Sequence, residues 1–273
     1  MKRRSMRRQN RTIQAASAID VLEDRQLLSA VSASIDGSDN NVDQPEWGST
    51  DEELLRLTSP EYGDGVSTPA GADRPSARQI SNEISAQSDS VLNSRNLTDF
   101  AWIWGQFLDH DIDLAKEGST ELFSIPVPAG DPYFDPMAEG DKTIPLIRAY
   151  FDPDTGTDVP REQINEITSF IDASNVYGSD ATRAAFLRAD GGKLKVSDGD
   201  YLPYNDGTQP NAGQGGDTAF VAGDVRANEN VALTSMHTIF VREHNRLVDE
   251  LAADHPDWSD DQLYNQAKAI VEA

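Results

Sequence analysis

The chain has 273 residues, of which 37% are hydrophobic and 26% are charged, so it is long enough to bury a substantial core. Its 47 acidic residues outnumber its 23 basic ones, and the resulting net charge of -24 argues against nucleic-acid binding and favours cations as partners. The absence of cysteine excludes disulfides, thiolate-ligated metals and cysteine nucleophiles.

The first 34 residues have the composition of a targeting segment and are expected to lie outside the fold. Six of the basic residues precede residue 12, and polar residues interrupt the stretch 12–21 where an ordinary signal would be apolar. The string VLEDRQLLSA at residues 21–30 is similar to a segment near the N-termini of many exported bacterial surface proteins, although a short amphipathic helix is the alternative. No apolar run approaches the ~18 residues that a membrane helix needs. We therefore expect an exported bacterial protein, secreted or at the cell surface, with no membrane span.

The first half of the remaining chain is expected to hold one convincing helix. Residues 35–95 are rich in Ser, Asp, Asn, Gly and Pro, which predicts irregular chain with few long elements. A helical period then predicts a helix over residues 97–108, with Asn96 or Thr98 as its cap; the apolar positions are Phe100, Ile103, Trp104, Phe107 and Leu108. Seven prolines between residues 115 and 162 predict an extended excursion.

The second half carries more helical pattern. Short helices are expected over residues 161–170 and 181–187, and the polar, glycine-rich stretch 201–217 is expected to be a loop. The longest helix is expected over residues 233–253, where Pro256 stops it, and the capping-box pattern at Ser259 opens a last helix. The pattern as a whole predicts a mainly α fold preceded by long irregular segments.

The densest polar cluster closes the first helix. Gln106, Asp109 and His110 are three and four residues apart, so they project toward roughly the same side of that helix. An imidazole beside a carboxylate and an amide can transfer protons near neutral pH. The alternative is an acidic helix end with a surface histidine, and the pattern alone favours that alternative.

Two further clusters lie downstream. Arg226 and Glu229 precede the longest helix and could form a plain ion pair at its start, or the guanidinium could point into a cleft and polarise an oxygen substrate. Thr168, Asp172 and Ser174 place hard oxygen donors at even offsets, as an extended segment would need to aim them together at calcium. A polar turn is the alternative there.

Two histidines lie seven residues apart on the longest helix. His237 and His244 could ligate a metal from one helix face. Histidines in an apolar stripe are more often hydrogen-bonded core residues, and that interpretation is favoured.

Taken together and in order, the clusters resemble the animal-type haem peroxidases of the peroxidase–cyclooxygenase superfamily. The resemblance is carried by WGQFLDHD at 104–111, TSFIDASNVYG at 168–178, GDVRANE at 223–229 and LTSMHTIFVREHNR at 233–246, and it extends from about residue 35 to the last residue. It implies a helical peroxidase fold around a buried haem b, of which residues 35–273 would form the N-terminal, distal half. It also implies reduction of hydrogen peroxide at the expense of an electron donor that the sequence does not identify.

The resemblance assigns roles residue by residue. It implies His110 as the distal acid–base, Arg226 as the group that stabilises developing negative charge, and Gln106 as the distal glutamine. Asp109 and Glu229 match carboxylates that form ester links to haem. Five residues match the calcium site of the family: Asp111, Thr168, Phe170 through its carbonyl, Asp172 and Ser174.

Two positions depart from the family pattern. A leukocyte member of the family has a methionine bonded to haem where this chain has Asn230, so no such link is expected. The proximal histidine that ligates iron lies well beyond the distal arginine in the family, and this chain ends at Ala273 before reaching such a position. We therefore expect a fragment that is inactive alone. The alternative is a short, non-catalytic, calcium-binding surface module on the same scaffold.

Overall fold

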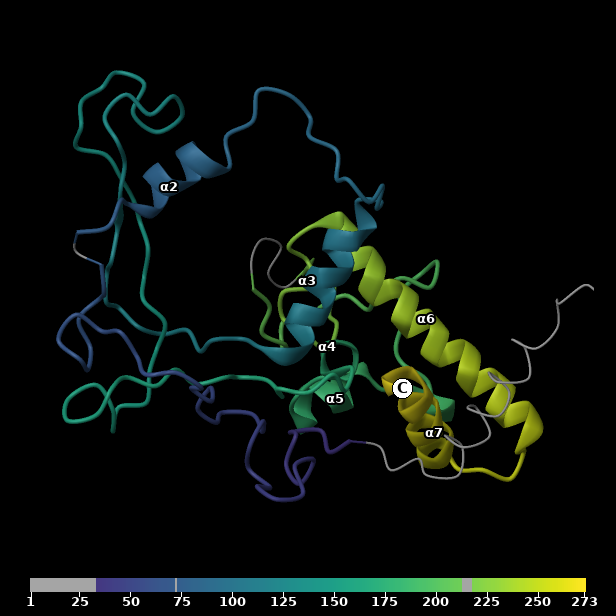
Figure 1. The fold of residues 1–273 in the computed structure, drawn as a ribbon. Coiled ribbons are helices and arrows are strands. Elements are labelled where there is room, and N and C mark those ends of the chain that lie inside the picture. Colours follow the sequence, from purple (N-terminus) through teal and green to yellow (C-terminus); the bar gives the residue numbers. More distant parts are fainter. Residues whose placement is uncertain (1–32, 72, 213–217) are drawn as a thin grey trace, which may run out of the picture.

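The computed structural model describes residues 33–71, 73–212 and 218–273, so most of the proposed targeting segment, and residues 213–217 of the expected loop, lie outside the described residues. Helices supply nearly all of the regular structure, and the described strands form a single two-stranded antiparallel pair (Figure 1). The elements are α2 (Ala77–Ile84), α3 (Phe100–Ile112), β1 (Ile125–Pro126), β2 (Thr143–Ile144), α4 (Ser174–Tyr177), α5 (Ala181–Leu187), the 3-10 helix η1 (Asp190–Gly192), α6 (Val231–Asp254) and α7 (Asp260–Glu272). Within these ranges, no helix is both long and apolar enough to cross a membrane.

Helix α3 confirms the predicted helix but is shifted toward the C-terminus. Asp99 occupies the N-cap position without a side-chain cap, so the expected caps at Asn96 and Thr98 are wrong. The reason lies in the preceding turn, where Oδ1 of Asn93 accepts hydrogen bonds from two backbone N–H groups and Asn96 has a positive φ of 53°. The residues that were expected to start the helix therefore belong to this turn instead.

Helices α6 and α7 follow the sequence pattern closely. The Asn230 side chain caps the start of α6, which ends at Asp254 just before Pro256. Ser259 opens α7 with the predicted capping box. Leu247 and Val248 of α6 are buried against Leu263 and Ala267 of α7, and this packing holds the two helices side by side (Figure 1).

The segment 161–170 is not helical, which contradicts the expected helix. It runs as irregular chain that makes isolated antiparallel bridges with residues 53, 115 and 151. The buried side chain of Asn165 ties it to the end of α3, because its Oδ1 accepts from the N–H of Leu114 at 2.6 Å and its Nδ2 donates to the carbonyl of Ile112 at 3.1 Å. These long-range bonds satisfy the backbone without a helix, and they place residues 168–174 beside α3.

The proline-rich excursion is extended, as expected, and carries β1 and β2. Helix α2 lies in the stretch expected to be irregular, and that expectation missed it. Ser76 caps it, and Ala77, Ile80 and Ile84 share a helical period although none of its residues is buried. The main core lies elsewhere, between α3, α4 and α6, and buries side chains such as Phe107, Tyr177 and Leu233.

Candidate active site

His110 sits in the last turn of α3 and is buried, with 4% of its surface exposed. Its Nδ1 lies 3.8 Å from Oδ1 of Asp224, and its Nε2 lies 3.8 Å from Oε2 of Glu229. Both distances exceed hydrogen-bond length, and Nδ1 makes no hydrogen bond within the described chain. Burial, helped by the positive charge of Arg226, lowers the pKa of His110, so the imidazole is neutral at neutral pH. The surface histidine considered from the sequence is therefore wrong.

Arg226 is fixed by Asp224, a residue that the sequence prediction missed. The Asp224 carboxylate accepts from Nε of Arg226 at 3.0 Å and from Nη2 at 2.8 Å, and Nη2 also donates to the carbonyl of Asp113 at 2.8 Å. The backbone N–H of Arg226 bonds to the same carboxylate at 2.7 Å, which makes a tight turn. The sequence did carry a signal for this turn. Asp224 precedes Arg226 by two residues, and an aspartate side chain commonly accepts a hydrogen bond from the backbone N–H two residues further along.

Arg226 and Glu229 do not form the ion pair considered as an alternative. Residues 225–228 form a turn rather than the start of a helix, and the guanidinium is directed to Asp224. Glu229 instead accepts a hydrogen bond from Nε2 of Gln106 at 2.8 Å. Gln106, Glu229 and His110 are thus brought together, whereas Asp109 is exposed on the same turn of α3.

A second cluster of polar side chains joins the last turn of α3 to residues 168–175. The buried carboxylate of Asp111 accepts from the backbone N–H of residues 173 and 175 and from Oγ of Ser174, each at 3.1 Å. Oγ1 of Thr168 bonds both to Oδ1 of Asp172 at 3.0 Å and to Oγ of Ser174 at 3.1 Å. Phe170 lies in the same segment, with its ring against Gly48.

The second cluster is assembled by a bend and not by an extended strand. Residues 169–172 are bent and Ser174 begins α4, so the even-offset reasoning was wrong although the oxygens do converge. Burial raises the pKa of Asp111 to about 6 and also raises the pKa of Asp172. Across the described residues, no group of three or more His, Cys, Asp or Glu side chains could hold a metal. The donor set here is two carboxylates with hydroxyl oxygens, which suits a hard cation such as calcium.

The other buried histidines lie in the core of α6. His244 bonds to the hydroxyl of Tyr177 at 2.9 Å and to the carbonyl of Gly192 at 3.0 Å, as expected of a core histidine. His237 is fully buried with its ring against Phe107, and neither ring nitrogen meets hydrogen-bond geometry. Burial lowers the pKa of each to about 4, so both are neutral.

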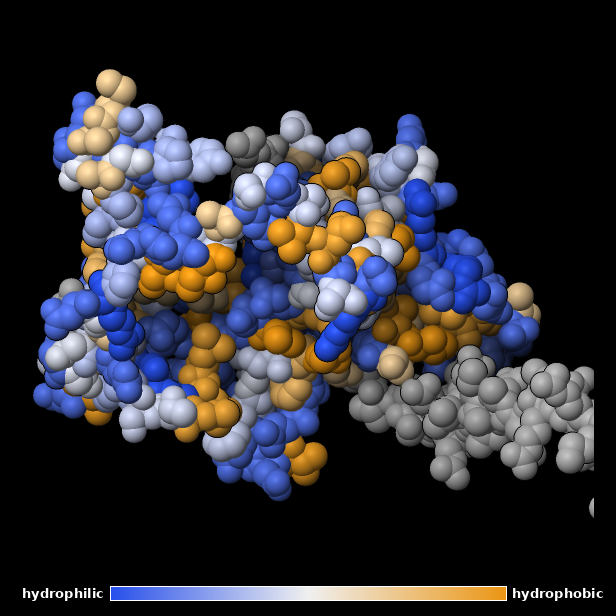
Figure 2. Space-filling model, turned by 45° about the horizontal axis from the view of Figure 1, so that its top comes forward, coloured by the Kyte–Doolittle hydropathy of each residue, from blue (hydrophilic) through white to orange (hydrophobic). Residues whose placement is uncertain are grey.

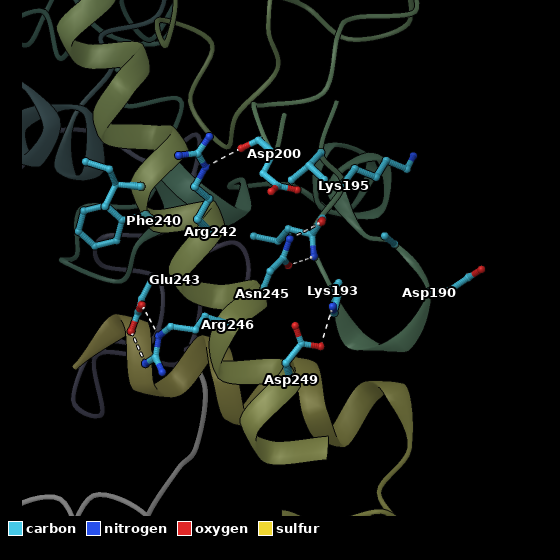
Figure 3. A pocket seen from close by; sticks show the side chains of 14 residues that line it. Asp190, Lys193, Lys195, Asp200, Phe240, Arg242, Glu243, Asn245, Arg246 and Asp249 are labelled. Atoms are coloured by element: carbon cyan, nitrogen blue, oxygen red, sulfur yellow. Dashed lines mark hydrogen bonds and ion pairs between the residues drawn. The ribbon is translucent and has the colours of Figure 1, made fainter. Parts of the chain in front are cut away.

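A cavity of about 990 Å³ lies between residues 189–200 and α6, apart from the predicted site residues (Figure 3). Three of its four lysine and arginine side chains are paired or hydrogen-bonded: Lys193 pairs with Asp249 at 2.7 Å, Arg246 pairs with Glu243 at 2.7 Å, and Arg242 donates to backbone carbonyls. The fourth, Lys195, lies over the ring of Phe186 at 4.6 Å.

The site around His110 borders an open, partly apolar surface. On α3, Phe100, Trp102 and Trp104 keep 55%, 58% and 44% of their surface exposed, and Val231 at the start of α6 keeps 83%. Figure 2 shows hydrophobic side chains on this face, around the hollow between the part that contains α2 and the part that contains α3. Exposed aromatics on the helix that ends at a neutral buried histidine, together with a fixed arginine, suit a flat, apolar, anionic group better than a small polar ligand.

A family model described as animal haem peroxidase matches residues 32–273, so the chain belongs to this family, which binds haem. Its sequence is 35% identical to lactoperoxidase of Homo sapiens over 284 residues, covering 88% of this chain and 39% of that protein. It is 36% identical to dual oxidase of Drosophila melanogaster over 251 residues, covering 86% of this chain and 16% of that protein.

Solved structures agree with this family. Peroxidase A from Dictyostelium discoideum superposes with a TM-score of 0.78 at 34% identity, covering 89% of this chain and 51% of that one. A fatty acid alpha-dioxygenase from Arabidopsis thaliana shares the fold, with a TM-score of 0.69 at 21% identity. The chain thus spans about half of peroxidase A and less of the other relatives named here.

Proposed function

We propose that this chain supplies the distal wall of a haem-dependent peroxidase, which reduces hydrogen peroxide and oxidises a separate electron donor. The observation that carries the proposal is the buried, neutral His110 beside Arg226, whose guanidinium Asp224 holds in one orientation. α3 and the turn before α6, far apart in sequence, contribute these groups to one place. Such an arrangement pairs a proton carrier with a fixed positive charge.

The chemistry divides between the bound group and the side chains. Haem b, when bound, would supply the two-electron redox chemistry that cleavage of the O–O bond needs, with the donor as the final source of those electrons. His110 takes a proton from one oxygen of hydrogen peroxide and returns it to the other oxygen, which departs as water. Arg226 stabilises the negative charge that develops while the bond breaks, and Gln106 helps to orient the peroxide.

Asp109 and Glu229 would hold the haem through ester links, since both side chains are exposed beside the distal wall. Asp111, Thr168, Asp172 and Ser174, with the Phe170 carbonyl, would bind calcium and so brace α3 against the segment below it. The buried carboxylates support this role, because a divalent cation compensates the cost of keeping them ionised.

We further propose that residues 35–273 form the distal half of a peroxidase domain whose remaining part supplies the iron ligand. The coverage of relatives supports this division, since the chain matches about half of peroxidase A. Residues 1–34 would direct export, which would place the enzyme outside the cell or at its surface.

The test uses the complete reading frame that contains these residues, expressed and reconstituted with haem. We expect peroxide-dependent oxidation of a phenolic dye, and we expect His110→Ala to slow it by roughly a hundredfold or more, the usual contribution of a positioned acid–base. Arg242→Ala, a change on the exposed side of α6, is the control and should leave the rate near wild type. Absence of peroxide turnover would instead favour the non-catalytic calcium-binding module, and equal rates for His110→Ala and wild type would remove His110 from the mechanism.

A further inference from the structure

The side chain of Asn230 joins the two segments that build the site. Its Oδ1 accepts a hydrogen bond from the backbone N–H of Leu233 at 2.9 Å, which makes it the N-cap of α6. Its Nδ2 donates to Oε1 of Gln106 on α3 at 3.0 Å. One amide group therefore connects the start of α6 to the middle of α3.

The N-cap hydrogen bond of Asn230 sets the orientation of two side-chain amides, that of Asn230 itself and that of Gln106. A backbone N–H needs an acceptor, so the oxygen of Asn230 must face α6 and its amino group must face Gln106. An amino group in turn needs an acceptor, so Oε1 of Gln106 faces Asn230 and its Nε2 faces Glu229. The hydrogen-bond pattern alone thus assigns the orientation of two amides that would otherwise be interchangeable.

The end of this chain of bonds is a carboxylate beside the distal histidine. Oε2 of Glu229 accepts from Nε2 of Gln106 at 2.8 Å and lies 3.8 Å from Nε2 of His110. The Glu229 side chain is 40% exposed, so without the bond from Gln106 its conformational entropy would favour solvent-facing rotamers.

We propose that Asn230 is a positioning residue: by capping α6 it sets the polarity of the Gln106 amide, and that amide holds the Glu229 carboxylate beside His110. The importance of this arrangement for peroxide reduction rests on the proposed function. The arrangement itself is a property of the chain without haem and can be measured there.

The decisive variant is Asn230→Asp, because aspartate caps a helix as well as asparagine but cannot donate a hydrogen bond. Gln106 then has a carboxylate on each side, so in either orientation its Nε2 donates to one of them while its Oε1 faces the other, and one bond of the chain is lost. We expect the Gln106 side-chain NH₂ signals to move in a ¹⁵N–¹H correlation spectrum of the labelled chain, and their protection from hydrogen exchange to fall about tenfold. The helical circular dichroism and the melting temperature should stay near wild type.

A second substitution should reverse the effect. Adding Glu229→Gln to Asn230→Asp supplies a new donor to Oε1 of Gln106 once that amide has turned, so both side-chain bonds of Gln106 are restored with opposite polarity. We expect the double variant to regain most of the lost protection, whereas Glu229→Gln alone keeps the wild-type polarity because its amide oxygen can accept from Gln106.

Ser259→Ala is the matched control, because it removes the N-cap of another helix, α7, without touching Gln106. It should lower the melting temperature and leave the Gln106 signals in place. The proposal is overturned if Asn230→Asp leaves those signals and their exchange unchanged, or if the double variant behaves like Asn230→Asp. Since no haem is used, failure of the complete protein to turn over peroxide would overturn the proposed function and leave this result standing.

Discussion

At the scale of single residues, the site depends on the pairing of Asp224. Burial alone would raise the pKa of this carboxyl group, but hydrogen bonds and charge from Arg226 outweigh burial and lower it. The two side chains keep only 1% and 11% of their surface exposed, so neither can recover its hydration if the other is removed. Asp224 therefore both stabilises the fold and fixes the guanidinium beside His110.

We predict that Asp224→Ala destabilises the chain by about 3 kcal/mol in urea unfolding at pH 7, because it leaves a buried guanidinium unpaired. Because the pKa of Asp224 is lowered on folding, its contribution is present above the unfolded pKa near 3.8 and is lost as the pH falls through the folded value. The difference between variant and wild type should therefore shrink below pH 4. Glu243→Ala breaks a pair of similar length to Arg246 on the surface of α6 and should cost less than about 1 kcal/mol. Equal costs for the two variants would contradict the role given to Asp224.

At the scale of elements, the local sequence pattern predicted the helices whose terminal backbone groups find hydrogen-bond partners within the same helix end. The α7 capping box and the stop of α6 before Pro256 act within a few residues, so they could be predicted. Residues 161–170 could not, because Asn165 and the bridges to distant residues replace helical hydrogen bonds with long-range ones. The same limit applies to the site: the pairing of Asp224 with Arg226 is local, but its position beside His110 of α3 arises only in the folded chain.

The contact between α3 and residues 168–174 leads to a prediction about calcium. Burial raises the pKa of Asp111 to about 6 and raises that of Asp172, so without a cation the fold gains stability as the pH falls from about 6 toward 4. A bound cation favours the ionised forms, so calcium should raise the melting temperature more at pH 7 than at pH 5. At a hundredfold excess over the dissociation constant the gain is about 2.7 kcal/mol.

Two substitutions distinguish calcium binding at this cluster from general screening of the chain's negative charge by calcium. Asp172→Asn should remove most of the calcium-dependent stabilisation, because it removes one of the two buried carboxylates at the cluster. Asp206→Asn removes the same charge from an exposed loop position and should leave the calcium effect intact. Identical melting with calcium and with a chelator in the wild-type chain would refute the assignment.

At the scale of the whole molecule, the chain has four histidines that could ligate a haem iron. His110 is assigned to the distal side, and His237 and His244 are fully buried in the core of α6. His255 follows the end of α6, where its ring stacks on Trp258 at a centroid distance of 3.9 Å. Each of these three downstream rings is thus engaged in packing, and none is presented on the open face that borders Trp104.

We therefore predict that haem added to the purified 273-residue chain gives no sharp Soret band and no peroxide-dependent dye oxidation above free haem. An axial histidine ligand is what would shift and sharpen that band, and exposing His237 or His244 to supply it would require opening the core between α3 and α6. Absorbance titration with haem checks this, with an apo-globin as the positive control for reconstitution. A strong Soret band with dye oxidation would contradict the prediction, and its loss in His237→Ala or in His244→Ala would identify the substitute ligand.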